Sequence, residues 1–333
     1  MLRSLVLALP LALLPFSVQA DASGGIVDGL VLPAMDELAG SGTALAQAAE
    51  ANCAGNDPAL RDAYHTAFDA WVRISHLRFG PAETDNRAFA LAFWPDTRGK
   101  TPKALAGMIA KENPAVADPE AFAEVSIAAQ GYYALEYMLF DDRLMAQGSA
   151  EYRCALVRAL STGIARNTDA IRRGWAGSYA AEMRSPGARY RDAAEVKQEL
   201  FKALLTGLQM TADMRLGRPL GTFDRPRPNR AEARRSGRSL RHVILALDAL
   251  EELALELADD NSDTAAALKA QFETTLQRAG QLEDPVFAGV AGPASRFRVE
   301  ALQQDVRDLT ALAEAQLGPA LGVEPGFNSL DGD

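Results

Sequence analysis

Apolar residues recur at helical spacing along almost the whole chain. This spacing predicts eight long helical segments, at residues 25–51, 58–77, 118–140, 148–175, 192–216, 230–259, 262–282 and 294–317. Two of them have clear start signals, because Asp57-Pro58 and Asp118-Pro119 place a capping aspartate before a proline that suits the first helical turn. Alternating runs typical of strands are absent from the sequence.

Proline and glycine separate the predicted helices, for example at Gly80-Pro81, Asp284-Pro285 and Gly292-Pro293. Long helices joined by short connections are typical of helix bundles. A count of four helices in each half predicts an all-α fold of two packed, four-helix-type bundles. We expect the N-terminal bundle at residues 21–165 and the C-terminal bundle at residues 166–333.

The first 20 residues have the order of a secretory signal peptide. Arg3 precedes the apolar run Leu5–Phe16. The small residues Val18 and Ala20 then occupy positions −3 and −1 before the expected cleavage site. The apolar run is shorter than the roughly 20 residues that a spanning helix needs. We therefore expect residues 1–20 to be removed and the mature chain to lie in the periplasm without spanning a membrane. An uncleaved membrane anchor is the alternative.

Charge and cysteine content narrow the function classes further. The chain has 44 acidic and 34 Lys or Arg residues, a formal net charge of −10. An acidic chain without a Lys/Arg tract is unsuited to binding nucleic acid, because phosphate backbones would repel it. Only Cys53 and Cys154 are present. In an oxidising compartment a single pair predicts a disulfide, and a metal–thiolate site would need more ligands.

The segment from Gln130 to Asp141 is the most informative part of the sequence. Tyr133 and Glu136 are three residues apart and share a helix face. Because Glu136 lies among apolar residues, its carboxylate must be paired, hydrogen-bonded or raised in pKa. Gly131 is predicted inside the helix, where glycine indicates a kink or a close backbone approach. The structural alternative is a glutamate held in place by an arginine.

Two other segments carry candidate site residues. Trp94-Pro95-Asp96 lies between predicted helices, where Asp96 could cap the next helix or the tryptophan could fill space under a loop. Ser236-Gly237-Arg238-Ser239 opens a predicted helix in an arginine-rich region. Such serines and arginines can bind a carboxylate or a phosphate. The arginines could instead pair with Glu136, with Asp96 or with the acidic C-terminus.

Together with the C-terminal segment 326–333, these motifs resemble those of the imelysin-like periplasmic proteins. That family carries a Gly-x-His-x-x-Glu motif, which Gly131 and Glu136 match, whereas Tyr133 stands in place of the histidine. The resemblance implies two helical bundles with a cleft between them near the motif. It also implies kinship with a surface peptidase and with proteins tied to iron uptake.

The tyrosine changes the chemistry that the motif can support. Phenol and carboxylate oxygens are hard ligands, which suit Fe(III) better than Zn(II). We therefore expect a binding or accessory protein linked to iron uptake rather than an enzyme, with iron or a small ligand bound between the bundles. The predicted ligand-binding residues are Gly131, Tyr133, Glu136, Trp94, Asp96, Ser236 and Arg238, of which Glu136 and Tyr133 are the predicted metal ligands. A metal-dependent peptidase and a non-catalytic module that binds an envelope protein are the alternatives.

Overall fold

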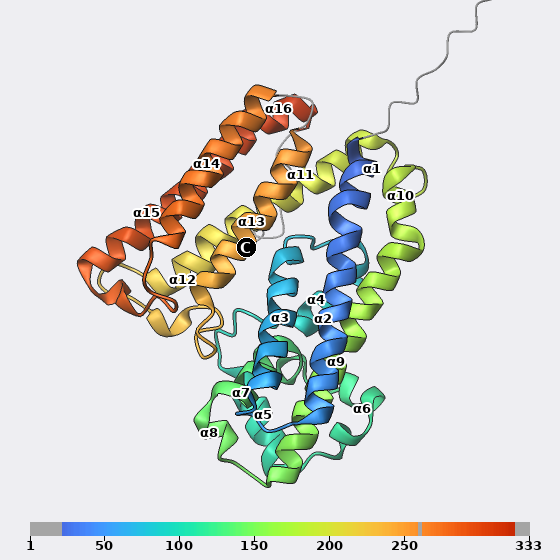
Figure 1. Cartoon of the computed structure of the whole chain (residues 1–333), viewed down its shortest axis with the longest axis vertical. Coiled ribbons are helices and arrows are strands. Elements are labelled where there is room, and N and C mark those ends of the chain that lie inside the picture. Colours follow the sequence, from blue (N-terminus) through green and yellow to red (C-terminus); the bar gives the residue numbers. More distant parts are fainter. Residues whose placement is uncertain (1–21, 259–261, 324–333) are drawn as a thin grey trace, which may run out of the picture.

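A computed structural model describes residues 22–258 and 262–323 (Figure 1). Over these residues the chain is helical and forms no strand, apart from one isolated bridge between Thr222 and Arg225. The predicted all-α fold is confirmed. Within the same ranges no helix is long and apolar enough to cross a membrane. The predicted signal peptide and the C-terminal motif at 326–333 lie outside the described residues.

The N-terminal half is built around three long helices. Helix α2 (Leu32–Ala51) packs against both α3 (Pro58–Ile74) and α9 (Ala150–Gly174), as Figure 1 shows. The shorter α7 (Gly131–Phe140) lies against α9 and contacts α3. Four further helices complete this half: α4 (Arg87–Leu91), α5 (Lys100–Lys111), α6 (Pro119–Ala123) and α8 (Asp142–Met145).

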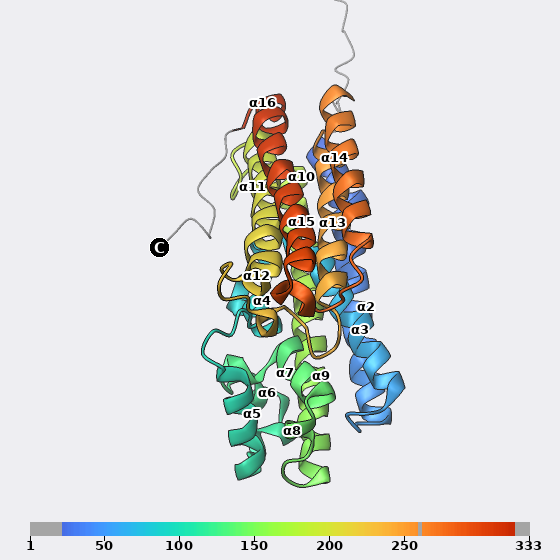
Figure 2. The ribbon, with the colours of Figure 1, turned by 90° about the vertical axis from the view of Figure 1, so that its left-hand side faces the viewer.

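The C-terminal half contains a second group of long helices, which run side by side in Figure 2. Helix α13 (Ser239–Leu257) packs against α11 (Ala193–Gln209) and α14 (Ser262–Gly280), while α15 (Pro293–Leu312) packs against α11 and α14. The contact between α3 and α13 joins the two groups. This contact places the ends of several helices at one junction, where the candidate site lies.

Short helices and turns extend the long ones. The remaining α-helices are α1 (Ala22–Ile26), α10 (Ala180–Arg184), α12 (Gly217–Leu220) and α16 (Gly318–Leu321). Wider, π-helical turns lie at η1 (Val27–Val31), η6 (Trp175–Tyr179), η7 (Met210–Leu216) and η10 (Ala313–Leu317). Short 3₁₀ turns lie at η2 (Gly80–Ala82), η3 (Thr84–Asn86), η4 (Pro114–Ala117), η5 (Ile127–Ala129), η8 (Pro228–Arg230) and η9 (Ala288–Ala291).

Helix α9 crosses the predicted boundary between the two bundles. The helix begins at Ala150 and continues through η6 and α10 to Arg184 without leaving helical backbone angles. Residues 165 and 166 therefore lie in the middle of a continuous helix rather than in a linker. The division of the chain into units at 21–165 and 166–333 stays a prediction.

The predicted helix over residues 118–140 is broken in the structure, which corrects that expectation. Asp118 caps α6 as expected, but α6 ends at Ala123 and α7 begins only at Gly131. Gly131 has φ +73°, and a Cβ atom there would lie 2.2 Å from the carbonyl oxygen of Leu91. The glycine thus permits the close approach that the sequence predicted, but it does so at a helix start rather than inside a helix.

Two other helix predictions need correction. The helix expected at 230–259 begins only at Ser239, because residues 231–238 form turns in which Ala233 and Gly237 have positive φ. The motif at 236–239 therefore opens helix α13, as predicted, with Ser239 as the first helical residue. Helix α5 was not predicted, although Asp96 ahead of it gave a partial signal.

The two cysteines form the predicted disulfide. Cys53 follows the end of α2 and bonds to Cys154 near the start of α9, with 5.0 Å between the Cα atoms. The bond joins positions 101 residues apart in the sequence and ties together two of the helices that form the N-terminal group.

Candidate functional site

Helix α7 carries two polar side chains into the junction between the two groups of helices. Most of its residues are buried, and Glu136 is only 2% exposed. The helix is buried because α3, α5 and α9 surround it. Tyr133 and Glu136 must therefore find their hydrogen-bond partners inside the protein, and each of them has one.

Glu136 is held by Ser236 rather than by the arginine that was the structural alternative. Its carboxylate accepts hydrogen bonds from the Ser236 backbone N–H at 2.9 Å and from the Ser236 hydroxyl at 2.8 Å. Burial raises the pKa of Glu136, while these hydrogen bonds and the positive charge of Arg235 oppose the rise. The structure thus brings together two predicted site residues that are 100 positions apart in the sequence.

Tyr133 belongs to a second buried group, which is centred on Glu232. The Tyr133 hydroxyl donates a hydrogen bond to the Glu232 carboxylate. The other oxygen of that carboxylate lies 2.8 Å from Nε of Arg215, and both side chains are 3% exposed. Burial alone would raise the pKa of Glu232, but the charge of Arg215, the His242 ring and the hydrogen bond from Tyr133 together outweigh it and hold the pKa well below its usual range. Burial raises the pKa of Tyr133, so its hydroxyl stays a donor.

His242 and Ser239 of α13 complete this group. The Ser239 hydroxyl donates to the backbone carbonyl of Glu232. The His242 ring is fully buried, with Nδ1 3.4 Å from the Glu232 carboxylate. The opposite side of the site is aromatic, since the Phe68 ring lies edge-on to His242 at 4.5 Å. The group therefore connects α7, α13 and η7 through one buried carboxylate.

Trp94 and Asp96 have separate roles in the structure. The Trp94 ring stacks on Tyr133, with 6.3 Å between the ring centres, so Trp94 lies beside the buried Glu232 group. Asp96 instead accepts hydrogen bonds from the backbone N–H groups of Arg98, Lys100 and Thr101. Burial would raise the pKa of Asp96, but these bonds hold it below its usual value. Asp96 thus caps α5, which was one of the two predicted roles.

The arginines of the 231–241 region pair with carboxylates other than those predicted. Arg238 forms an ion pair with Asp69 of α3, which also binds Arg241 at 3.1 Å. Arg235 pairs with Asp141 at 3.0 Å. These contacts join the C-terminal half to α3 and to the end of α7, so the predicted linking role of the arginines holds with different partners.

A cavity of about 280 Å³ lies next to the Glu232 group, between the two halves of the chain. Its walls come from the end of α3, the segment before α5, the α11–η7 helix and α13, and they include His76, Trp94, Pro95, Met210, Met214 and Arg215. Of the predicted site residues, only Trp94 lines this cavity. Burial and the positive charges of Arg215 and Arg73 lower the pKa of His76 to about 3, so its ring is neutral at pH 7.

Sequence reasoning missed Glu232, Arg215 and His76. Arg215 had a usable signal, because it continues the apolar face formed by Leu204, Leu208 and Ala212 on one helix. A charged residue on such a face is expected to be buried and paired. Glu232 lies in a turn and had no comparable pattern.

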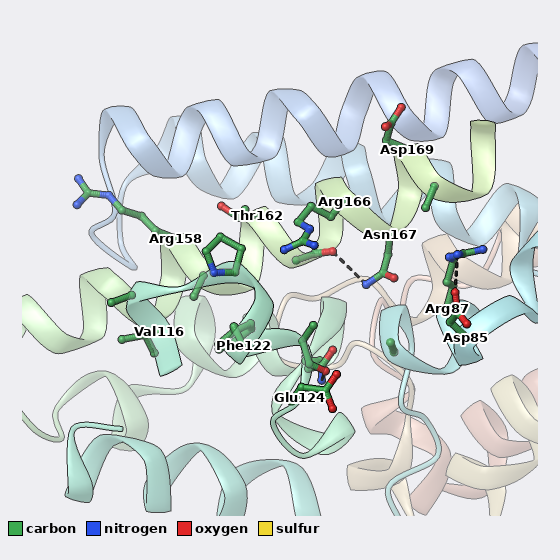
Figure 3. Close-up of a pocket in the computed structure, with 18 of the residues that line it drawn as sticks. Asp85, Arg87, Val116, Phe122, Glu124, Arg158, Thr162, Arg166, Asn167 and Asp169 are labelled. Atoms are coloured by element: carbon green, nitrogen blue, oxygen red, sulfur yellow. Dashed lines mark hydrogen bonds and ion pairs between the residues drawn. The ribbon is translucent and has the colours of Figure 1, made fainter. Parts of the chain in front are cut away.

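A second, larger hollow lies along α9. Its volume is about 640 Å³, and it lies between α9, the segment around Phe122 and the start of α4, which carries Arg87. Figure 3 shows the side chains that line this groove. The arginines in this groove are paired with carboxylates: Arg87 with Asp85, Arg158 with Glu50, Arg166 with Glu120 and Arg173 with Asp169. Its positive charge is therefore neutralised within the protein.

The contacts of Tyr133 and Glu136 do not suit a metal site. The Tyr133 oxygen is directed at Glu232 and the Glu136 oxygens at Ser236. Over residues 22–258 and 262–323, no three His, Cys, Asp or Glu side chains are grouped so that they could hold an ion. An Fe(III) ion would require several oxygen ligands that are not already engaged. Iron coordination by Glu136 and Tyr133 stays a prediction.

Comparison with known proteins decides the family. The family model described as Imelysin, a peptidase family, matches residues 31–313. The chain belongs to the imelysin family. An imelysin-like protein from Psychrobacter arcticum has a similar fold, with a TM-score of 0.75 at 20% identity, over 93% of this chain and 99% of that one. Iron-regulated protein A of Synechococcus elongatus is 23% identical over 319 residues, which are 89% of this chain and 85% of that protein.

Proposed function

We propose that this member of the imelysin family is a periplasmic binding or accessory protein linked to iron uptake, with its ligand in the cavity between the two halves. The proposal rests on the cavity of about 280 Å³, which lies beside the buried polar group centred on Glu232. The link to iron rests on the similarity to a protein named iron-regulated protein A. The periplasmic location rests on the signal-like residues 1–20, and the disulfide suits an oxidising compartment.

The buried group next to the cavity supports a binding role, because it fixes one wall in place. Trp94 is held against Tyr133, and Tyr133 is held by the Glu232 carboxylate. Arg215 both lines the cavity and neutralises Glu232. A wall that is ordered before the ligand arrives lowers the entropic cost of binding. Met210 and Met214 of η7 also line the cavity and supply flexible, apolar surface that adapts to a ligand's shape.

A peptidase role has less support from the site. Hydrolysis would need a carboxylate that is directed at a water molecule or at a metal-bound water. The Glu136 carboxylate instead accepts two hydrogen bonds from Ser236. The contacts of Glu136 are those of a residue that joins α7 to the 231–238 segment, so we assign no catalytic residue.

Complementation of a gene deletion tests the proposal. The deletion strain should grow poorly when iron is limiting, and the wild-type gene should restore growth. A Met214→Trp variant, whose larger side chain fills the cavity, should not restore growth although the protein is present in the periplasm. An Ala159→Trp variant, which fills the groove along α9, is the matched control and should restore it. Full rescue by Met214→Trp would refute the proposal. Normal growth of the deletion strain when iron is limiting would refute it as well.

A further inference from the structure

Arg218 lies close to the cavity between the two halves of the chain, next to Trp94, which lines that cavity. It follows Met214 by four residues on the continuous helix formed by η7 and α12, so it lies one turn beyond a residue that lines the cavity. Its guanidinium carbon is 5.6 Å from the centre of the Trp94 ring. The Arg218 Nε atom is buried and has no hydrogen-bond partner. The side chain therefore presents a partly desolvated cation beside the aromatic wall of the cavity.

Arg230 adds a second positive charge next to Arg218. The η8 turn, which ends at Arg230, packs against α12, and the backbone N–H of Arg227 donates to the carbonyl of Pro219 at 2.8 Å. Burial and the like charge of Arg230 both lower the pKa of Arg218. The packing of η8 on α12 thus brings a second positive charge into the neighbourhood of Arg218, and an anion between the two arginines would be attracted by both.

Several arginines near the site form no ion pair among the residues that the structure describes, namely Arg218, Arg225, Arg227, Arg230 and Arg234, whereas Arg215, Arg235 and Arg238 each have a carboxylate partner. The arginines of the α9 groove are paired as well. Arg218 differs from the other unpaired arginines because its guanidinium lies over the Trp94 ring, which lines the cavity. In a chain with a formal net charge of −10, an unpaired arginine beside a cavity is well placed to attract an anion.

We propose that Arg218 and Arg230 bind the oxyanion group, a carboxylate or a phosphate, of a ligand whose apolar part lies against Trp94 in the cavity. The guanidinium group donates two parallel hydrogen bonds to such oxygens, which fixes orientation as well as charge. Trp94 and Met214, which both line the cavity, supply apolar surface that suits the apolar or aromatic part of the ligand. This inference rests on the proposed function, because it names the class of ligand that the cavity takes.

Calorimetric titration of the full mature chain tests the inference with three probes: 2-naphthoate, its neutral counterpart 2-naphthamide, and inorganic phosphate. We expect 2-naphthoate to bind at least about tenfold more tightly than 2-naphthamide, as expected for a charge-assisted hydrogen bond. Arg218→Gln should remove this preference and leave the affinity for 2-naphthamide unchanged. Arg225→Gln, which removes an exposed arginine of the neighbouring turn, is the matched control and should keep the preference. Phosphate binding that Arg218→Gln abolishes would also support the site.

Several outcomes would overturn the inference. Equal binding of the acid and the amide, or an Arg218→Gln variant that keeps the preference, would show that the arginines do not select an anion. If phosphate binds only after Asp331→Asn and Asp333→Asn, the arginines bind the acidic C-terminal residues of the chain itself rather than a ligand. Failure of all three probes to bind would also overturn it. If Met214→Trp abolishes amide binding while the acid has no advantage, the cavity proposal stands and the anion site alone fails.

Discussion

The buried ion pair between Arg215 and Glu232 allows a sharp test of the site. Replacing Arg215 by methionine keeps much of the side-chain volume but removes the cation that lies 2.8 Å from the Glu232 carboxylate. It also removes the hydrogen bonds from Arg215 to the hydroxyls of Ser75 and Thr211. The Glu232 carboxylate would then keep the Tyr133 hydroxyl as a donor, but it would carry a buried charge without a counterion.

The expected loss follows from the burial of both partners. Because each side chain is 3% exposed, water cannot take the place of the missing cation. Breaking such a buried pair from one side costs about 3–5 kcal/mol, whereas an exposed pair contributes about 0.2–1 kcal/mol. We expect Arg215→Met to lower the free energy of unfolding by about 3 kcal/mol, the lower end of that range, because the hydrogen bond from Tyr133 remains.

Urea unfolding at pH 7, followed by far-ultraviolet circular dichroism, measures this loss. Arg73→Met is the matched control, since Arg73 pairs with Glu252 at 2.6 Å but the two side chains are 29% and 46% exposed. The control should lose less than about 1 kcal/mol. Adding Glu232→Gln to Arg215→Met should restore part of the lost stability, because it removes the buried carboxylate that has no counterion. A loss in Arg215→Met no larger than in the control would refute the reasoning.

Three further predictions concern other contacts of the protein. Ser236→Ala should lower the free energy of unfolding by about 1–3 kcal/mol, because Glu136 loses a hydrogen bond in a buried site; urea unfolding measures it. His76 has a pKa of about 3 when folded and about 6.5 when unfolded, so the unfolded chain binds the extra proton as the pH falls below about 6.5. The wild type should therefore lose about 2 kcal/mol more stability than His76→Asn between pH 7 and pH 5. Replacing Cys53 and Cys154 by serine should cost about 4 kcal/mol in thermal or urea unfolding.

Each of these predictions has a clear contradictory result. A Ser236→Ala variant with wild-type stability would mean that the hydroxyl contact to Glu136 is not formed. Identical pH dependence in the wild type and His76→Asn would mean that the His76 ring is protonated in the folded protein. Unchanged stability in the double serine variant, or in the wild type after reduction, would mean that the disulfide does not constrain the unfolded chain.

The sequence predicted the helical fold because local signals determine most of it. Apolar periodicity located the long helices, and the aspartate–proline starts were correct, since Asp57 accepts a hydrogen bond from the N–H of Leu60 and Asp118 from that of Glu120. Helix lengths were less predictable. The break before Gly131 depends on the neighbouring backbone of Leu91, which no local pattern records.

The site was only partly predictable for the same reason. The apolar surroundings of Glu136 correctly indicated a buried carboxylate, but its partner Ser236 is 100 residues away. Glu232, which organises the second buried group, lies in a turn and is bound by residues from three different elements. The contacts of Glu136 with Ser236 and of Tyr133 with Glu232, which are 100 and 99 residues apart, follow from the packing of the two halves and not from the spacing of residues in either half.

Mass spectrometry of the intact protein under non-denaturing conditions tests the central proposal most directly. The wild type and the Met214→Trp variant would be isolated from cells grown with limiting iron. The binding proposal predicts that the wild type carries the added mass of a bound ligand. This added mass should be absent from Met214→Trp, because the larger side chain fills the cavity between the two halves. An added mass of equal abundance on both proteins, or none on the wild type, would contradict the assignment of this cavity as the ligand site.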